Sequence, residues 1–219
     1  MLSRDPHLRP TDLLAAGAGA LGIPLAPAHL VAFECYLQEI ERWSARMNLT
    51  ALRTPSEVVQ DGFLDSLACL PLLRAGAGTA VDLGSGAGFP ALPLAILRSQ
   101  VRFTLVEATR KKVTFLRHIV RTLGLVHVRV LHGRAEALAR DPEHLGVYHV
   151  ALARAVAPLP EQARLVRPFL APGGVFLAQL AADPSSDEAA KALTEAGWIV
   201  ADAAPGASPR RRVLALRPG

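Results

Sequence analysis

The sequence predicts an α/β fold: a mostly parallel sheet with helices on both faces, preceded by an N-terminal helical extension and ending in an antiparallel hairpin. Two observations predict it. Apolar residues recur at helical spacing over the first third of the chain, and beyond Gly76 short apolar strands alternate with helical segments, which favours parallel pairing. We divide the 219 residues into a helical extension, 1–75, and a sheet domain, 76–219, that form one structural unit.

The helices of the extension are predicted from the period of its apolar residues. From Phe33 to Trp43 these residues lie on one helical face, which predicts a helix over about 28–46. The pattern returns over about 55–70, where Pro55 suits the first helical turn.

An uncharged stretch precedes these helices. Residues 13–33 contain no Asp, Glu, Lys or Arg and are long enough to cross a membrane. Three glycines and two prolines within the stretch would break a spanning helix. We therefore expect a loop between two helices, and no membrane segment.

The sheet domain is predicted from its alternation of strands and helices. The expected strands are Thr79–Leu83, Val101–Val106, Val126–Leu131, Tyr148–Ala153 and Val175–Leu180, and Ile199–Ala203 with Val213–Leu216 form the closing hairpin. Helices over about 90–98 and 109–123 connect the first three strands, and a Pro172-Gly-Gly turn precedes the fifth.

Composition limits the kinds of site to expect. Apolar residues make up 51% and charged residues 20% of the chain, so a packed core is expected. Two cysteines exclude a disulfide scaffold, and the seven histidines show no metal-ligand spacing. The first residues lack the layout of a secretory signal. We expect a cytoplasmic monomer without a bound metal.

The strongest local motif is a glycine-rich turn after the first predicted strand, Val81-Asp-Leu-Gly-Ser-Gly-Ala-Gly-Phe-Pro90. It is no complete dinucleotide fingerprint, because Phe89 stands where the third glycine belongs, and it lacks the Gly-Lys-Ser/Thr of a phosphate-binding loop. It is no nucleophile elbow, because Gly86 stands where the serine would be. The pattern instead resembles the first motif of class I methyltransferases, which bind S-adenosyl-L-methionine.

An acid at the end of the second predicted strand supports this interpretation. Glu107 lies 23 residues after Gly84, at a position where a carboxylate can accept hydrogen bonds from both hydroxyls of a ribose. The alternative is a surface acid among arginines.

Five segments, taken in order, resemble the bacterial 16S rRNA (guanine-N7) methyltransferase G family, also called glucose-inhibited division protein B. They are Trp43-x-x-x-Met-Asn-Leu-Thr-Ala, Phe63-Leu-Asp-Ser-Leu, Asp82 to Pro90, Lys111-Lys-Val-Thr-Phe-Leu, and Arg134-Ala-Glu followed by Ala153-Arg-Ala. The resemblance implies a Rossmann-like class I methyltransferase fold and methylation of N7 of a guanosine in the small-subunit 16S rRNA. It covers roughly residues 30–219.

The same resemblance implies the cofactor-binding residues, which are Gly84, Gly86, Phe89, Glu107, Ala135, Glu136 and Arg154. Gly84 and Phe89 would line the pocket, and Ala135 and Glu136 would edge the adenine. Because a guanidinium is repelled by the sulfonium charge, Arg154 would bind either the methionyl carboxylate or an RNA phosphate. The alternative for Arg154 is a salt bridge at the sheet edge. Asp65 is expected to orient the helical extension.

The chain departs from the family pattern at three places. Asp61 and Gly62 stand where the family usually has a basic residue and a histidine, and Ser44 follows Trp43 where an asparagine is usual. After the fifth strand, Leu180 lies in a segment that lacks the usual lysine. These departures leave the predicted cofactor pocket intact. They put in doubt how the target base is held.

Charge along the chain indicates a polyanion partner. The net charge is +5, and residues 98–134 alone carry nine basic side chains against one acid. The candidate RNA contacts are Arg110, Lys111, Lys112, Arg117, Arg134, Arg210, Arg211 and Arg212. The expected partner is 16S rRNA or the 30S particle, and the alternative interpretation is a solvated basic face.

The predicted chemistry needs no catalytic base, because guanine N7 carries a lone pair and no proton. Cys35 and Cys69 both lie in the extension, away from the position of a cytosine-C5 nucleophile, and no Asn/Asp-Pro-Pro motif follows the fourth strand. Two alternatives remain at this point: a methyltransferase of the same fold that acts on a protein or small molecule, and a non-catalytic RNA-binding module.

Overall fold

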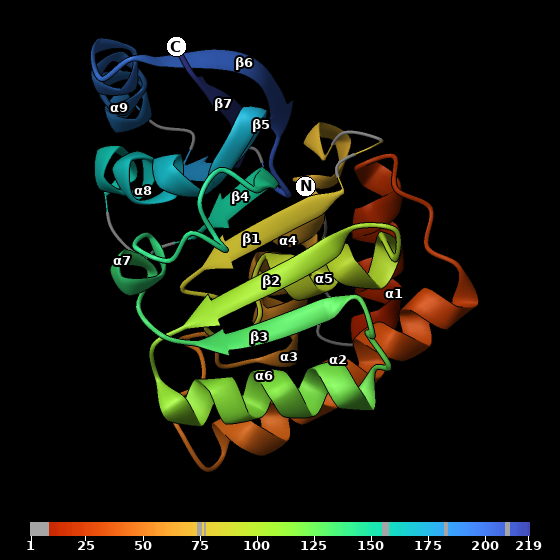
Figure 1. Cartoon of the computed structure of the whole chain (residues 1–219). Coiled ribbons are helices and arrows are strands. Elements are labelled where there is room, and N and C mark those ends of the chain that lie inside the picture. The colour runs from red at the N-terminus through yellow and green to blue at the C-terminus, as the bar shows by residue number, and fades with distance from the viewer. Residues whose placement is uncertain (1–8, 74–75, 77, 155–157, 182–183, 209–210) are drawn as a thin grey trace.

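A mixed sheet forms the centre of the computed structural model, which describes residues 9–73, 76, 78–154, 158–181, 184–208 and 211–219 (Figure 1). Its strands are β1 (Thr79–Leu83), β2 (Arg102–Glu107), β3 (Val128–His132), β4 (Tyr148–Ala153), β5 (Leu170–Ala181), β6 (Trp198–Pro205) and β7 (Arg211–Pro218). They lie in the order β3-β2-β1-β4-β5-β7-β6. Strands β1 to β5 pair in parallel, whereas β7 is antiparallel to β5 and β6. The predicted mostly parallel sheet with a C-terminal hairpin is therefore confirmed.

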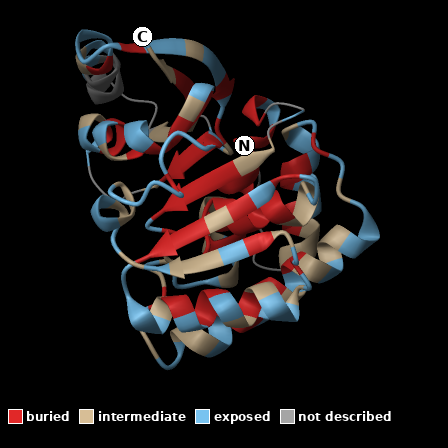
Figure 2. Ribbon diagram, in the orientation of Figure 1, coloured by how far each residue is buried: buried red, intermediate tan, exposed pale blue. Residues whose placement is uncertain are grey.

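Helices of the extension cover one face of this sheet together with the two helices that follow β1 and β2. They are α1 (Pro10–Ala20), α2 (Pro27–Ser44), α3 (Pro55–Glu57), α4 (Asp65–Leu67), α5 (Ala91–Leu97) and α6 (Arg110–Thr122). Their apolar side chains share one core with inward-facing residues of the sheet such as Ala80 and Leu105. Figure 2 shows this burial along the central strands.

The other face carries a second, smaller core. It is covered by α7 (Ala135–Leu138), α8 (Leu159–Val166) and α9 (Pro184–Glu195), and it contains Val81, Val106 and Trp198. None of these three helices is predicted above. Two of them, α8 and α9, lie in the return from β4 to β5 and between β5 and β6.

The predicted helix over 55–70 is interrupted. A π-helical segment, Val58–Leu64, lies between α3 and α4, and a 3₁₀ turn, Leu70–Leu72, follows. Such wide turns inside helices are frequent at functional sites, because they displace the residues that follow. Here the segment carries Asp61 and leads directly into Asp65.

The expected loop between two helices is present but is shorter than the stretch 13–33, because α1 extends to Ala20 and α2 begins at Pro27. Gly17 does not break α1. It lets α1 approach the π-helical segment so closely that a β-carbon at this position would overlap the side chain of Leu64. No helix among the described residues is both long and apolar enough to cross a membrane.

The Pro172-Gly-Gly turn is also misplaced in the prediction. These residues lie inside β5 and form an irregularity opposite Tyr148, where the pairing shifts from Leu170 to Val175. Gly173 has a φ of 75°, which glycine adopts without strain. The boundary at residue 75 stays a prediction, since residues 74–75 and 77 lie outside the described residues.

Candidate functional site

Backbone hydrogen bonds to β2 fix the position of the glycine-rich turn that follows β1. Gly84, Gly86 and Gly88 all have positive φ values, 74°, 58° and 97°. The amide groups of Gly84 and Ser85 both donate to the carbonyl of Val106, at 2.8 and 3.1 Å. Because glycine has no side chain, a turn of this shape lets the backbone approach a ligand closely.

A cavity of about 480 Å³ lies against this turn, at the carboxyl ends of the parallel strands. Its lining residues are Leu49 to Leu52, Gly84 to Ala87, Phe89, Glu107, Lys112 and Arg154. The volume is within the range of small-molecule and cofactor sites, about 300–1,000 Å³. Five of the seven predicted cofactor residues, Gly84, Gly86, Phe89, Glu107 and Arg154, are therefore brought together.

Glu107, at the end of β2, accepts hydrogen bonds from the glycine-rich turn and from the segment that leads into α6. One carboxylate oxygen, Oε2, accepts from the amide of Gly86 at 2.9 Å, and Oε1 accepts from the amide of Thr109 at 2.7 Å. The residue is buried, with 7% of its surface exposed, so it is not a surface acid. Each oxygen keeps a further lone pair for a ligand hydroxyl.

A side chain of the helical extension contacts the glycine-rich turn directly. The hydroxyl of Tyr36, on α2, donates to the carbonyl of Ala87 at 2.5 Å. Burial raises the pKa of Tyr36 well above its usual value, so this hydroxyl keeps its proton. A β-carbon on Gly88 would lie 2.5 Å from the same hydroxyl. Glycine is therefore needed at this position both for its positive φ and for the close approach of Tyr36. The sequence shows Tyr36 only as an apolar helix position.

Gly62 has a related role on the other side of the turn. A β-carbon at this position would lie 2.7 Å from the ring of Phe89. The ring of Phe63 packs edge-on against Phe89, with the two ring centroids 5.9 Å apart. The departure from the family pattern at Gly62 therefore makes room for a predicted pocket residue.

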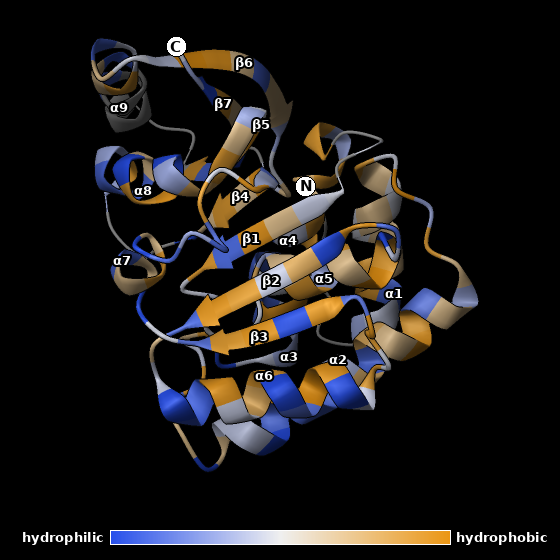
Figure 3. Ribbon diagram, viewed as in Figure 1, coloured by the Kyte–Doolittle hydropathy of each residue, from blue (hydrophilic) through white to orange (hydrophobic). Residues whose placement is uncertain are grey.

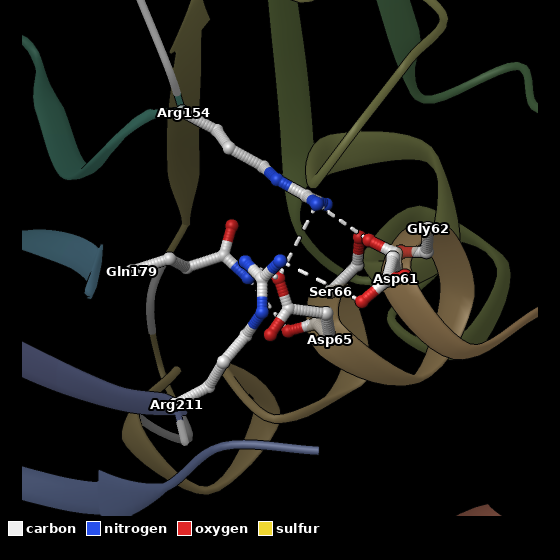
Figure 4. Close-up of polar contacts among 7 residues, drawn as sticks. All are labelled: Asp61, Gly62, Asp65, Ser66, Arg154, Gln179 and Arg211. Carbon is white, nitrogen blue, oxygen red and sulfur yellow. Dashed lines mark hydrogen bonds and ion pairs between the residues drawn. The ribbon is translucent and has the colours of Figure 1, made fainter. Parts of the chain in front are cut away.

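Arg154 directly follows β4 and lines the cavity. Figure 4 shows its guanidinium pointing toward Asp61 and Asp65 of the extension. Its Nη2 donates to the backbone carbonyl of Asp61 at 2.5 Å and lies 3.4 Å from Oδ2 of Asp65. The second guanidinium nitrogen, Nη1, is buried and has no hydrogen-bond partner among the described residues. Both the predicted pocket position and the alternative salt bridge are therefore present.

The remaining predicted cofactor residues lie apart from this lining. Ala135 and Glu136 begin α7, directly after β3, and they are half-buried and exposed respectively. They are not among the residues that line the cavity, and their contact with an adenine stays a prediction.

The candidate RNA contacts lie in different environments. Arg110, Lys111, Arg117 and Arg134 are exposed, and Lys112 reaches the cavity. Arg211 is already paired, through Nη1 to Asp65 at 3.1 Å and through Nη2 to Asp61 at 3.5 Å, and Arg212 is half-buried in β7. Arg210 lies outside the described residues.

One group of side chains could hold a metal ion. Among the described residues, Asp141, Glu143 and His144 place potential ligand atoms within 4.8 Å of one another. Glu143 and His144 line a separate hollow with Thr79, at the start of β1, so the group lies at the amino-terminal edge of the sheet. The expectation of a protein without a metal is untested.

Solved structures share this fold at low sequence identity. A SAM-dependent methyltransferase from Aquifex aeolicus has a TM-score of 0.57 and 16% identity, and the alignment covers 82% of this chain and 97% of that one. The mitomycin 7-O-methyltransferase MmcR has a TM-score of 0.57 and 16% identity, with 97% and 74% covered. The fold is that of class I S-adenosylmethionine-dependent methyltransferases.

Sequence comparison is more specific. The GidB family, described as rRNA small subunit methyltransferase G, matches residues 29–200. The chain is 49% identical to ribosomal RNA small subunit methyltransferase G of Deinococcus deserti, over 77% of this chain and 69% of that protein. It is 40% identical to the protein of the same name from a Roseiflexus species, over 93% and 89%. The chain is thus a methyltransferase and belongs to the rRNA small subunit methyltransferase G family.

Proposed function

We propose that this protein transfers the methyl group of S-adenosyl-L-methionine to N7 of a guanosine in 16S rRNA. One observation carries the proposal: in a chain of this family, Gly86, Glu107 and Arg154 surround a single cavity at the carboxyl ends of the strands. We further propose that the protein acts as a monomer in the cytoplasm, on the rRNA alone or within the 30S particle.

The residues around the cavity fit the cofactor. Glu107 offers buried carboxylate lone pairs for ribose hydroxyls, and the positive φ of Gly86 leaves its position without a side chain that would fill the cradle. The unpartnered Nη1 of Arg154 is suited to an anionic group. When bound, the cofactor would supply an electrophilic methyl group on a sulfonium sulfur, with the neutral thioether as the leaving group.

The protein's part in this reaction is positioning. A target that carries a lone pair and no proton needs no general base, and the residues that line the cavity include no histidine or cysteine. Cys69 is buried, which raises the pKa of its thiol, so it is not a nucleophile. These features support attack by N7 over cytosine C5.

The basic face of α6 is suited to the RNA backbone. The helix begins three residues after Glu107. Its exposed residues Arg110 and Lys111 directly precede Lys112, which lines the cavity, and the exposed Arg117 lies further along the helix. Figure 3 shows the alternation of hydrophilic and hydrophobic residues along this helix. We therefore assign phosphate contacts to α6, and we assign Arg211 to its contacts with Asp61 and Asp65.

The proposal is tested by methyl transfer from radiolabelled S-adenosylmethionine to 30S particles that lack the modification, with naked 16S rRNA in parallel. We expect 7-methylguanosine, identified by mass after digestion to nucleosides. Gly84→Asp, which puts a carboxylate into the glycine turn, is the inactive control. Label in the protein fraction or in another nucleoside would overturn the substrate or the N7 assignment.

The contact from the extension to the glycine turn gives a further prediction. Tyr36→Phe removes a buried hydrogen bond to Ala87, so we expect a loss of about 1 kcal/mol in the free energy of unfolding. Because the lost bond holds the turn, we also expect the affinity for S-adenosylhomocysteine to fall. Urea denaturation and calorimetry measure the two effects.

Tyr148→Phe is the matched control. Its buried hydroxyl hydrogen-bonds His144 at 2.8 Å, at the amino-terminal edge of the sheet. This variant should lose a similar amount of stability with no change in ligand affinity. If Tyr36→Phe and Tyr148→Phe bind S-adenosylhomocysteine with equal affinity, Tyr36 does not support the glycine-rich turn.

A further inference from the structure

Asp65 is a buried carboxylate outside the cavity, yet it holds an arginine that lines the cavity (Figure 4). Its Oδ2 accepts from Nη1 of Arg211 at 3.1 Å and lies 3.4 Å from Nη2 of Arg154. Its backbone carbonyl accepts from Nε2 of Gln179 at 2.7 Å. Side chains from β5, from β7 and from the residue that follows β4 thus reach one turn of the extension.

The contacts fix the direction of the Arg154 side chain. Nη2 is occupied by the Asp61 carbonyl and the Asp65 carboxylate, both on the extension. Because a guanidinium is planar, anchoring Nη2 also fixes the plane in which Nη1 lies. Nη1 is the nitrogen without a partner among the described residues, and Arg154 is part of the cavity lining.

Because the ion pair between Asp65 and Arg154 is largely buried, it is sensitive to the loss of either partner. Burial lowers the pKa of Arg154 and raises that of Asp65. The Asp65 carboxylate offsets this effect for Arg154, and the guanidinium groups of Arg154 and Arg211 offset it for Asp65. Removing one partner of a buried ion pair leaves the other charge uncompensated, and the remaining side chain then moves toward solvent or another partner.

We propose that Asp65 is a positioning residue for the reaction: it holds Arg154 so that the guanidinium binds the methionyl carboxylate of the cofactor. The proposal rests on the proposed function for the identity of that cofactor. It makes the helical extension part of the cofactor site, through a residue that never touches the cofactor.

Two ligands that differ in one group test the proposal. S-adenosylhomocysteine carries the carboxylate, and S-adenosyl-3-thiopropylamine is the same molecule without it. Asp65→Asn keeps the side-chain volume but turns an amide toward a guanidinium. We expect Asp65→Asn and Arg154→Ala each to raise the Kd for S-adenosylhomocysteine about 10-fold or more, and the Kd for the amine less than about twofold.

The double variant gives a second readout. If Asp65 acts through Arg154, the double variant should bind S-adenosylhomocysteine no more weakly than Arg154→Ala alone. Glu39→Gln is the matched control, because Glu39 is another buried acid of the extension, paired with Arg42 and His118 away from the cavity. It should lose stability without a change in either Kd.

The contrary outcomes are distinct. Equal losses for both ligands in Asp65→Asn would assign Asp65 a purely structural role, and unchanged binding in Arg154→Ala would assign that arginine to RNA. If Asp65→Asn does not fold, Arg154→Lys replaces it: lysine has one nitrogen in place of the planar guanidinium fork, so it cannot occupy the positions of both Nη2 and Nη1, and retained affinity overturns the proposal. Absence of ligand binding by the wild type would refute the proposed function instead.

Discussion

Replacing Glu107 by glutamine is expected to weaken the binding of S-adenosylmethionine by roughly 100-fold. The two carboxylate oxygens accept from different amides, Oε2 from Gly86 and Oε1 from Thr109. A glutamine side chain has one oxygen, so its NH₂ group would face an amide donor in either orientation. The glycine turn would lose its fixed distance from β2, and the ribose would lose an acceptor.

Calorimetry with S-adenosylhomocysteine measures the effect on affinity, and urea denaturation separates it from unfolding. Glu143→Gln is the control, since Glu143 is an exposed acid at the opposite edge of the sheet. Affinities of the two variants within threefold of each other would remove Glu107 from the cofactor site.

The position of Glu107 could be predicted because the signals for it are local. A strand that ends in glycines, followed by a second apolar strand that ends in an acid, places both ends at one edge of a parallel sheet. The pairing of Leu83 with Val106 confirms this register. The same holds for the hairpin of β6 and β7, which are consecutive strands in the chain.

The support of the site could not be predicted in this way. Tyr36 reaches Ala87 across 51 residues, Gln179 reaches Asp65 across 114, and Arg211 reaches Asp65 across 146. Each of these side chains has an ordinary local explanation, as a helix face, a strand position or a basic tail. Only the packing of the extension against the sheet gives them a role at the site.

Glycine was the residue most easily misinterpreted. In the turn after β1 its positive φ values bear out the expected tight backbone, whereas the sequence predicts a helix break at Gly17 that the structure does not have. In α1 it instead allows close packing on Leu64, which local sequence does not specify. The π-helical segment is similar, because the apolar pattern over 55–70 fits an uninterrupted helix equally well.

The buried carboxylate of Asp82 predicts an unusual pH dependence of stability. Asp82 is the last but one residue of β1, is fully buried, and neither carboxylate oxygen makes a hydrogen bond of good geometry to another described residue. The nearby Ser85 and the amide of Ala91 offset only part of the effect of burial. Burial raises the pKa of Asp82 from its ordinary value of 3.8 to about 8. The native state therefore keeps a proton on Asp82 at pH values where the unfolded chain has lost it.

We expect the free energy of unfolding to fall as pH rises from about 4 to about 8, and Asp82→Asn to abolish this part of the fall. Between these values the unfolded state binds fewer protons than the native state, so raising the pH favours unfolding. Above pH 8 the neutral variant should exceed the wild type by on the order of 5 kcal/mol, and near pH 4 the two should be similar. Urea denaturation at pH 5 and pH 9 measures the difference, with Asp141→Asn, an exposed acid, as the control. Parallel pH profiles for the wild type and Asp82→Asn would mean that Asp82 is ionised in the native state and has a compensating partner.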